Sequence, residues 1–206
     1  MEITWLGRTC FRLRGRDGVV LTDPCPPGSG YKIGKQQVSI VTFSRAFDPE
    51  YTYREVVPPD AMTFDAPGEY EHNNILVTGV ARKRPDGERN VMFFFEMDGI
   101  RIGHLGLPGP SGPPRIDEIK DVDILLMPVG GGISLGAAAA ADVMTTIEPK
   151  IAIPMHYRTD AETLAIDPID AFVKETGSTA EPQPKLSVTR GTLGTDLSVV
   201  ILEPRS

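Results

Sequence analysis

The strongest constraint on the fold lies in the second half of the chain, where two short apolar runs frame a glycine loop and an alanine-rich segment. The first run, DVDILLMPV (121–129), is apolar almost throughout, as expected for a strand covered on both faces. Gly130–Gly132 and the helical segment LGAAAAADVMTTI (135–147) follow it, and the second run, IAIPM (151–155), ends at His156. This alternation of strand and helix is typical of sheets that are covered by helices.

The first half of the chain has the composition of β structure. Short runs rich in β-branched and aromatic residues are separated by turns that contain glycine. The runs are EITWLG, CFRLRG, VVLTDP, QVSIVTFS, ILVTGVA, NVMFFFEM and IRIGHLG. Asp98-Gly99 separates the last two runs and predicts a hairpin turn.

Helix signals are confined to the second half. RIDEIK (115–120) is short and polar. Ser134 is a candidate cap for the helix over 135–147. A second helix is predicted over DPIDAFVKET (167–176), closed by Gly177.

The order of the elements predicts the fold class. A β-rich first half, helix–strand alternation and the closing strands LSVTRG and LSVVILE fit two packed sheets covered by helices. We therefore expect an α/β (α+β) protein with a four-layer αββα sandwich. With 206 residues and strand patterns on both sides of the Pro/Gly stretch 106–114, the chain is expected to form a single domain, 1–206.

Charge and composition argue against several classes of protein. A net charge of −7 and a pI of about 5.0 argue against nucleic-acid binding. No stretch approaches the roughly 20 apolar residues of a membrane span, and MEITWLG has no signal-peptide pattern, so we expect a cytoplasmic protein. Cys10 is expected to be buried, and Cys25, in a proline-rich loop, exposed. The 19 prolines are compatible with a thermophilic source.

A series of segments resembles one family in the order of its own motifs. The segments are ITWLGRTCFRL, LTDP, DAPGEYE, GERN, IRIGHLG, DILLMPVGGG and PKIAIPMHY. The chain resembles the small metallo-β-lactamase-fold hydrolases, the branch that includes ascorbate-6-phosphate lactonase-like proteins. The resemblance implies the αββα fold and, where the ligands are kept, two zinc ions that activate a water molecule.

Most of the zinc ligands that the resemblance implies are replaced. The family cluster His-x-His-x-Asp-His falls on Arg45, Phe47, Pro49 and Glu50. The opening histidine falls on Arg8, the bridging aspartate on Leu107, and a further histidine on the stretch Arg82–Arg84. The family positions that are kept are Asp23, Glu69, His104 and His156, of which only His156 would be a direct ligand.

These replacements predict that no metal serves as a cofactor. One imidazole does not hold Zn²⁺ against water, and an arginine beside it repels the ion. Phe47 and Leu107 have no lone pairs to offer, and Glu50 and Asp48 are hard oxygen donors that suit other ions better. We expect neither a two-zinc site nor a tightly bound catalytic metal.

Arg8 and Arg45 are the residues most indicative of a changed site. Two guanidiniums at neighbouring strand ends would form a pocket for an anion. Alternatively, Arg45 pairs with Asp23, Asp48 or Glu50 and fills the volume of the lost metal. A paired arginine still has donors to offer, so the two interpretations are compatible.

The remaining candidates carry weaker signals. His156 is a candidate base or a hydrogen-bonded relic, and Asp23 is a second candidate catalytic residue. His104 is interpreted as structural, although it belongs to the candidate ligand-binding set with Arg8, Arg45 and Glu50. His72 is expected in a polar loop, and Gly130–Gly132 is expected to line the cleft.

Three functions remain open at this point. The first is an inactive, metal-free homologue that binds a small anionic molecule or a protein partner. The second is a hydrolase with one ion held by His156 with Glu50 or Asp23, or with metal-free acid–base chemistry at His156. The third is a structural subunit of a homo-oligomer.

Overall fold

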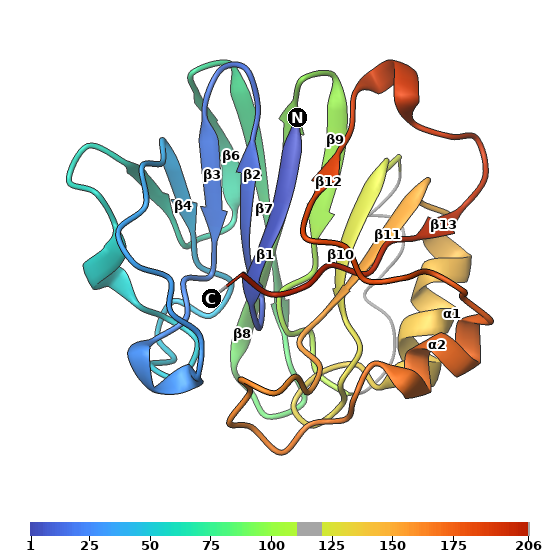
Figure 1. Ribbon diagram of the computed structural model, residues 1–206. Coiled ribbons are helices and arrows are strands. Elements are labelled where there is room, and N and C mark those ends of the chain that lie inside the picture. The colour runs from blue at the N-terminus through green and yellow to red at the C-terminus, as the bar shows by residue number, and fades with distance from the viewer. Residues whose placement is uncertain (111–120, 206) are drawn as a thin grey trace.

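The computed structural model describes residues 1–110 and 121–205 and has two packed β-sheets (Figure 1). The first sheet has six strands in the order β12-β1-β2-β3-β4-β5. Their bounds are Glu2–Gly7 (β1), Cys10–Arg14 (β2), Val19–Thr22 (β3), Ile40–Thr42 (β4), Met62–Phe64 (β5) and Leu186–Ser187 (β12). The strands expected near the N-terminus are therefore confirmed.

The second sheet has seven strands in the order β13-β11-β10-β9-β8-β7-β6. Their bounds are Gly68–His72 (β6), Ile75–Lys83 (β7), Arg89–Met97 (β8), Ile100–His104 (β9), Ile124–Pro128 (β10), Ile151–Met155 (β11) and Ser198–Val199 (β13). Strands β6 to β9 form an antiparallel meander, whereas β9, β10, β11 and β13 are parallel neighbours. The parallel strands therefore deliver their carboxyl ends to one edge of the sheet.

The predicted hairpin turn is confirmed between β8 and β9. Asp98 and Gly99 have φ values of 54° and 72°, the left-handed pair that a two-residue turn of this kind requires. His72, expected in a loop, instead closes β6 and pairs with Ile75 across a second tight turn. It lies far along the chain from the other two histidines and takes no part in their contacts.

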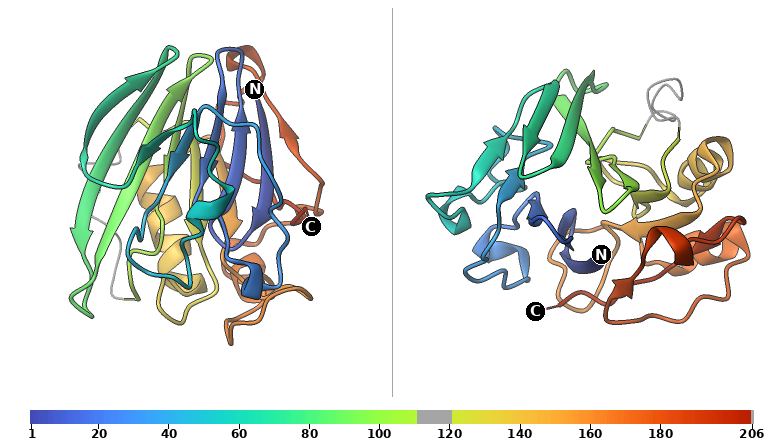
Figure 2. Two further views of the ribbon diagram at one scale, coloured as in Figure 1. Left: turned by 90° about the vertical axis from the view of Figure 1, so that its left-hand side faces the viewer. Right: turned by 90° about the horizontal axis from the view of Figure 1, so that it is seen from above.

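One hydrophobic core fills the space between the sheets, which face each other in both views of Figure 2. Strand β2 contributes Phe11 and Leu13 to this core, and β8 contributes Phe93 and Phe95 from the opposite sheet. Side chains of a strand alternate between its faces, so Cys10 at the start of β2 points away from this core.

A second core covers the outer face of the six-stranded sheet. Cys10, Leu21 and Val41 pack there against Tyr31 and Cys25 from the loop that follows β3. The expectation of an exposed Cys25 is therefore wrong: it is 3% exposed, and its thiol donates to the Gly7 carbonyl at 3.3 Å. The loop after β3, rather than an α-helix, covers this face, and its apolar side chains bury the sheet.

The two α-helices of the described residues, α1 (Ala137–Ile147) and α2 (Asp170–Thr176), lie beside β10, β11 and β13 (Figure 1). Gly136, not Ser134, is the N-cap of α1, and no side chain caps it. Gly177 ends α2 with a φ of 64°, as expected. Short 3-10 helices are η1 (Pro27–Ser29), η2 (Arg54–Val56) and η4 (Arg190–Thr192).

The helix expected over 115–120 lies outside the described residues. Within residues 1–110 and 121–205, no helix has the length and apolar character needed to cross a membrane. The sandwich of two sheets with few helices is confirmed as the fold of this chain.

Candidate functional site

The carboxyl edge of the parallel strands brings three chain segments to one point. His156 directly follows β11 with a φ of 51°, and its amide donates to the Arg8 carbonyl at 3.1 Å. Its own carbonyl accepts the amide of Gly130 at 3.1 Å. A Cβ at Gly130 would lie 2.3 Å from that carbonyl, so only glycine permits this approach. The backbone therefore fixes His156 beside Arg8.

The imidazole of His156 has no hydrogen-bond partner. The residue is fully buried, and both Nδ1 and Nε2 are unpartnered within the described residues. Burial and, after it, the positive charges of Arg8, Arg84 and Arg45 together lower the pKa of His156 to about 3. The ring is therefore neutral at pH 7, with one N–H donor and one lone pair.

Arg8 is a buried, fully engaged guanidinium. It donates to Glu162 Oε1 at 3.2 Å from Nε and at 3.0 Å from Nη2, and to the Glu50 carbonyl at 2.8 Å. Glu50 thus reaches the site through its backbone, while the residue itself is exposed. Glu162 was not identified from the sequence, because it lies in an irregular loop with no motif.

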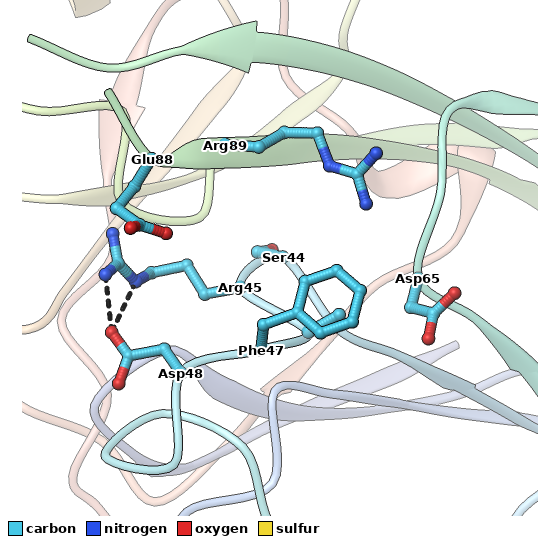
Figure 3. A pocket seen from close by; sticks show the side chains of 8 residues that line it. Ser44, Arg45, Phe47, Asp48, Asp65, Glu88 and Arg89 are labelled. Carbon is cyan, nitrogen blue, oxygen red and sulfur yellow. Dashed lines mark hydrogen bonds and ion pairs between the residues drawn. The ribbon is translucent and has the colours of Figure 1, made fainter. Parts of the chain in front are cut away.

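Arg45 pairs with Asp48, which is one of the three partners considered for it. Nε lies 2.9 Å from Asp48 Oδ2, and Nη2 also bonds this oxygen (Figure 3). The third nitrogen, Nη1, is buried and has no partner among the described residues. The pair lines a cavity of about 30 Å³ next to Ser44 and Glu88. Charge neutralisation is therefore confirmed for Arg45, yet one donor remains unused.

Arg84 adds a third guanidinium that was not among the candidates. It donates to the carbonyls of Leu107 at 2.9 Å and Ile133 at 3.0 Å, and it lies 2.7 Å from Asp86. Burial lowers the pKa of Arg84, and the charge of Arg45 acts in the same direction. Its Nε is buried and has no partner within residues 1–110 and 121–205. The signal in the sequence was its place in the basic stretch Arg82–Arg84, where the resemblance implies a histidine.

The ring of Tyr51 lies close to Arg8, Arg45 and His156. Its ring centre lies 5.5 Å from the guanidinium carbons of both Arg8 and Arg45, and 5.8 Å from the ring centre of His156. Burial raises the pKa of Tyr51 to about 12. Aromatic faces attract cations, so the ring separates the two arginines and stabilises them. Tyr51 was also missed in the sequence.

Asp23 and His104 form a separate, structural pair beneath this group. Asp23 Oδ1 accepts the Ser44 amide at 2.6 Å, and Oδ2 lies 3.9 Å from His104 Nε2. The imidazole also meets the Thr9 carbonyl at 2.8 Å. Burial raises the pKa of Asp23 and lowers that of His104. Asp23 does not pair with Arg45. Instead, Asp23 and His104 bond the backbone of Ser44 and Thr9, which are the neighbours of Arg45 and Arg8 in the chain.

The residues at this edge do not fit a zinc ion. No three His, Cys, Asp or Glu side chains in the described part of the chain are grouped so that they could hold a metal. His156 is surrounded by positive charge, and the Glu162 carboxylate is bound by Arg8. Phe47 is 84% exposed and has no lone pair to offer, while Leu107 contributes a carbonyl that holds Arg84. Zinc needs several neutral or negative donors grouped around it, and the described residues place no such group beside His156.

Comparisons with known proteins place the chain in a family. Residues 2–156 match the family described as "Beta-lactamase superfamily domain". A UPF0173 metal-dependent hydrolase from Polaromonas sp. is 31% identical over 76% of this chain and 77% of its own length. A UPF0173 protein from Pyrococcus furiosus is 29% identical over 85% of this chain and 90% of its own.

A solved structure extends the likeness to the whole chain. A candidate Zn-dependent hydrolase of the metallo-β-lactamase superfamily from Thermotoga maritima superposes with a TM-score of 0.80 at 30% identity. The likeness covers 98% of both chains. The protein therefore belongs to the metallo-β-lactamase superfamily and, within it, to the UPF0173 metal-dependent hydrolase family.

Proposed function

We propose that this chain is a metal-free member of its family, inactive as a zinc hydrolase, that binds a small anion between Arg45, Arg84 and His156. The observation that carries the proposal is a set of buried nitrogens that have no partner among the residues that the structure describes: Nη1 of Arg45, Nε of Arg84, and both ring nitrogens of His156. We also propose kinship with the ascorbate-6-phosphate lactonase-like branch, on the ordered segments of the sequence.

The energetics support a ligand at this point. A buried polar atom without a partner costs about 1–3 kcal/mol, and more when the group is charged. Here the unpartnered donors of two cations accompany a neutral imidazole. The carboxylates that neutralise the arginines lie toward solvent, since Asp48 is 21% and Asp86 45% exposed. The interior side of the cluster therefore keeps its positive character, which an oxyanion would satisfy.

The alternative is hydrolysis at an altered site centred on His156. One metal ion would need Glu50 or Asp23 as a further ligand, but Glu50 is exposed and Asp23 is bound to Ser44. A general base works best with a pKa near the working pH, whereas the pKa of His156 is lowered to about 3. These observations favour binding over catalysis.

The test combines metal analysis with titration of the purified protein by inorganic phosphate. We expect less than about 0.1 equivalent of zinc per chain, because a site without most of its ligands should bind zinc at least about tenfold more weakly. We also expect phosphate to bind and to raise the melting temperature relative to chloride at equal ionic strength. Arg45→Ala should remove this binding. Arg16→Ala is the matched control, because Arg16 is an exposed arginine in the turn between β2 and β3.

Two results would overturn the proposal. The first is two equivalents of zinc that survive dialysis. The second is phosphate binding that is absent, or that is equal in the Arg45→Ala variant and the unchanged protein.

A further inference from the structure

A second cavity lies on the outer face of the six-stranded sheet and shares no lining residue with the cavity beside Arg45. Its volume is about 420 Å³, a size that is common for the sites of small molecules. Three of its lining residues are the cations Arg12, Lys32 and Arg205, and no Asp or Glu among the described residues lines it. In a chain with a net charge of −7, such a basic cavity is a marked local exception.

The strand register places Arg12 in this cavity. Its neighbours in β2, Phe11 and Leu13, belong to the core between the two sheets, so Arg12 faces the outer side. Thr4 of β1 is directly opposite Arg12 in the register and lines the same cavity. The floor of the cavity is therefore the outer face of β1 and β2, which is a rigid part of the fold.

Two other segments bring the remaining cations to the same place. Lys32 belongs to the loop after β3, and its neighbour Ile33 packs with Leu6 in the core on the outer face. Arg205 belongs to the C-terminal segment, which passes beside β1 (Figure 1), and its amide donates to the Trp5 carbonyl at 2.9 Å. Three segments that are far apart in the sequence thus each contribute one positive charge.

These cations are not neutralised by the part of the protein that the structure describes. Arg12, Lys32 and Arg205 form no salt bridge with another described residue. Glu2 lies on the same strand as Thr4, but its carboxylate accepts Lys185 at 2.6 Å and does not line the cavity. Like charges around one volume repel each other, so an anion that enters this cavity is attracted by all three.

We propose that this cavity binds a small molecule that carries two phosphate groups, such as a diphosphate. One phosphate group carries about −1.5 to −2 at pH 7, so two groups are needed to balance three cations. The guanidiniums of Arg12 and Arg205 are planar forks of donors that match phosphate oxygens. Leu6 and Ile33 offer apolar contacts to the rest of the molecule. This site does not depend on the anion site proposed beside Arg45.

Calorimetric titration with inorganic pyrophosphate at pH 7 and constant ionic strength tests the proposal. We expect Arg12→Ala, Lys32→Ala and Arg205→Ala each to weaken binding at least about tenfold, because each removes hydrogen bonds to a charged group. Lys32 and Arg205 are exposed and lie outside the strands, so these two variants should fold like the parent. Arg16→Ala removes the same charge from an exposed turn outside the cavity and should bind as the parent does.

The Arg45→Ala variant distinguishes this cavity from the anion site at the carboxyl edge. It should still bind pyrophosphate, and at least about tenfold more tightly than orthophosphate, because one phosphate leaves part of the positive charge unmatched. The inference is overturned if pyrophosphate does not bind, if Lys32→Ala and Arg205→Ala bind it as the parent does, or if Arg45→Ala binds both anions equally. None of these results changes the outcome of the phosphate test at Arg45, so the two proposals can fail separately.

Discussion

The two ends of the parallel strands carry charged clusters of opposite design. At the start of β10 and β11, Asp123 accepts Lys150 at 2.7 Å, Arg190 at 2.6 Å and the Arg101 amide at 3.0 Å. Burial acts to raise the pKa of Asp123, but these hydrogen bonds and charges lower it overall. At the carboxyl end, Arg8 and Arg84 are themselves buried, and polar atoms of Arg84 and His156 have no partner in the described part of the chain.

The difference lies in desolvation: the charges around Asp123 form pairs at little cost to the fold, whereas the buried charges at the carboxyl end destabilise it. The cations around Asp123 remain hydrated, since the side chains of Lys150 and Arg190 are 33% and 59% exposed to solvent. Exposed pairs of this kind form at little desolvation cost and add little stability. Burying Arg8 and Arg84 requires their removal from water, and imperfect pairing does not fully offset that cost. A cluster of the second kind is expected where a ligand completes it.

Arg8→Ala should have the largest effect on stability. The substitution leaves the Glu162 carboxylate buried and unpaired, and breaking such a pair costs about 3–5 kcal/mol. Urea unfolding measures the loss. The double variant Arg8→Met/Glu162→Leu should recover part of it, because no charge is left unpaired although the amides of Thr163 and Leu164 lose their acceptor. A loss below about 1 kcal/mol, the range of exposed pairs, would show that the two clusters do not differ as described.

Acid should destabilise the protein through His156. Its pKa is about 3 in the folded chain and about 6.5 when unfolded, so only the unfolded state takes up the proton between these values. The free energy of unfolding should fall with decreasing pH, by about 2 kcal/mol from pH 6.5 to 5. His156→Gln should show a smaller fall, by about this amount. His104 keeps its lowered pKa in both proteins, so equal falls would exclude His156 as the cause.

Arg45→Ala should have an intermediate effect. Its partner Asp48 is 21% exposed and can regain water, and the substitution also removes the unpartnered Nη1. We expect a loss of about 1–2 kcal/mol, between those of exposed and buried pairs. Arg45→His should not restore zinc binding, because the other ligands are still absent. A melting temperature equal to that of the parent would show that the pair of Arg45 with Asp48 does not stabilise the fold.

Arg190→Ala should have the smallest effect. The arginine is 59% exposed, and Lys150 still pairs with Asp123 after the change. The expected loss is about 0.5 kcal/mol or less, as for other exposed ion pairs. Urea midpoints of the two proteins should therefore nearly coincide at physiological salt. A loss comparable to that of Arg8→Ala would remove the contrast between the two ends of the sheet.

The elements of the site were predicted more successfully than its contacts. Period-two patterns and turn dipeptides such as Asp98-Gly99 act locally, so they predicted the strands well. The places of Arg8 and Arg45 after β1 and β4 were also predicted, because the strands that precede them were. Ser134 was wrong as a helix cap, and Cys25 was wrong as an exposed thiol, because loop packing overrode the local composition.

The sequence by itself determined the sandwich and the metallo-β-lactamase superfamily, because these follow from residue types in a fixed order along the chain. The tertiary structure alone decided that Arg84, Tyr51 and Glu162 join Arg8, Arg45 and His156, since no local pattern brings such distant loops together. It also decided that Asp48, rather than Asp23, neutralises Arg45. Side-chain pairing depends on distance and burial, and these quantities arise only when the two sheets have packed.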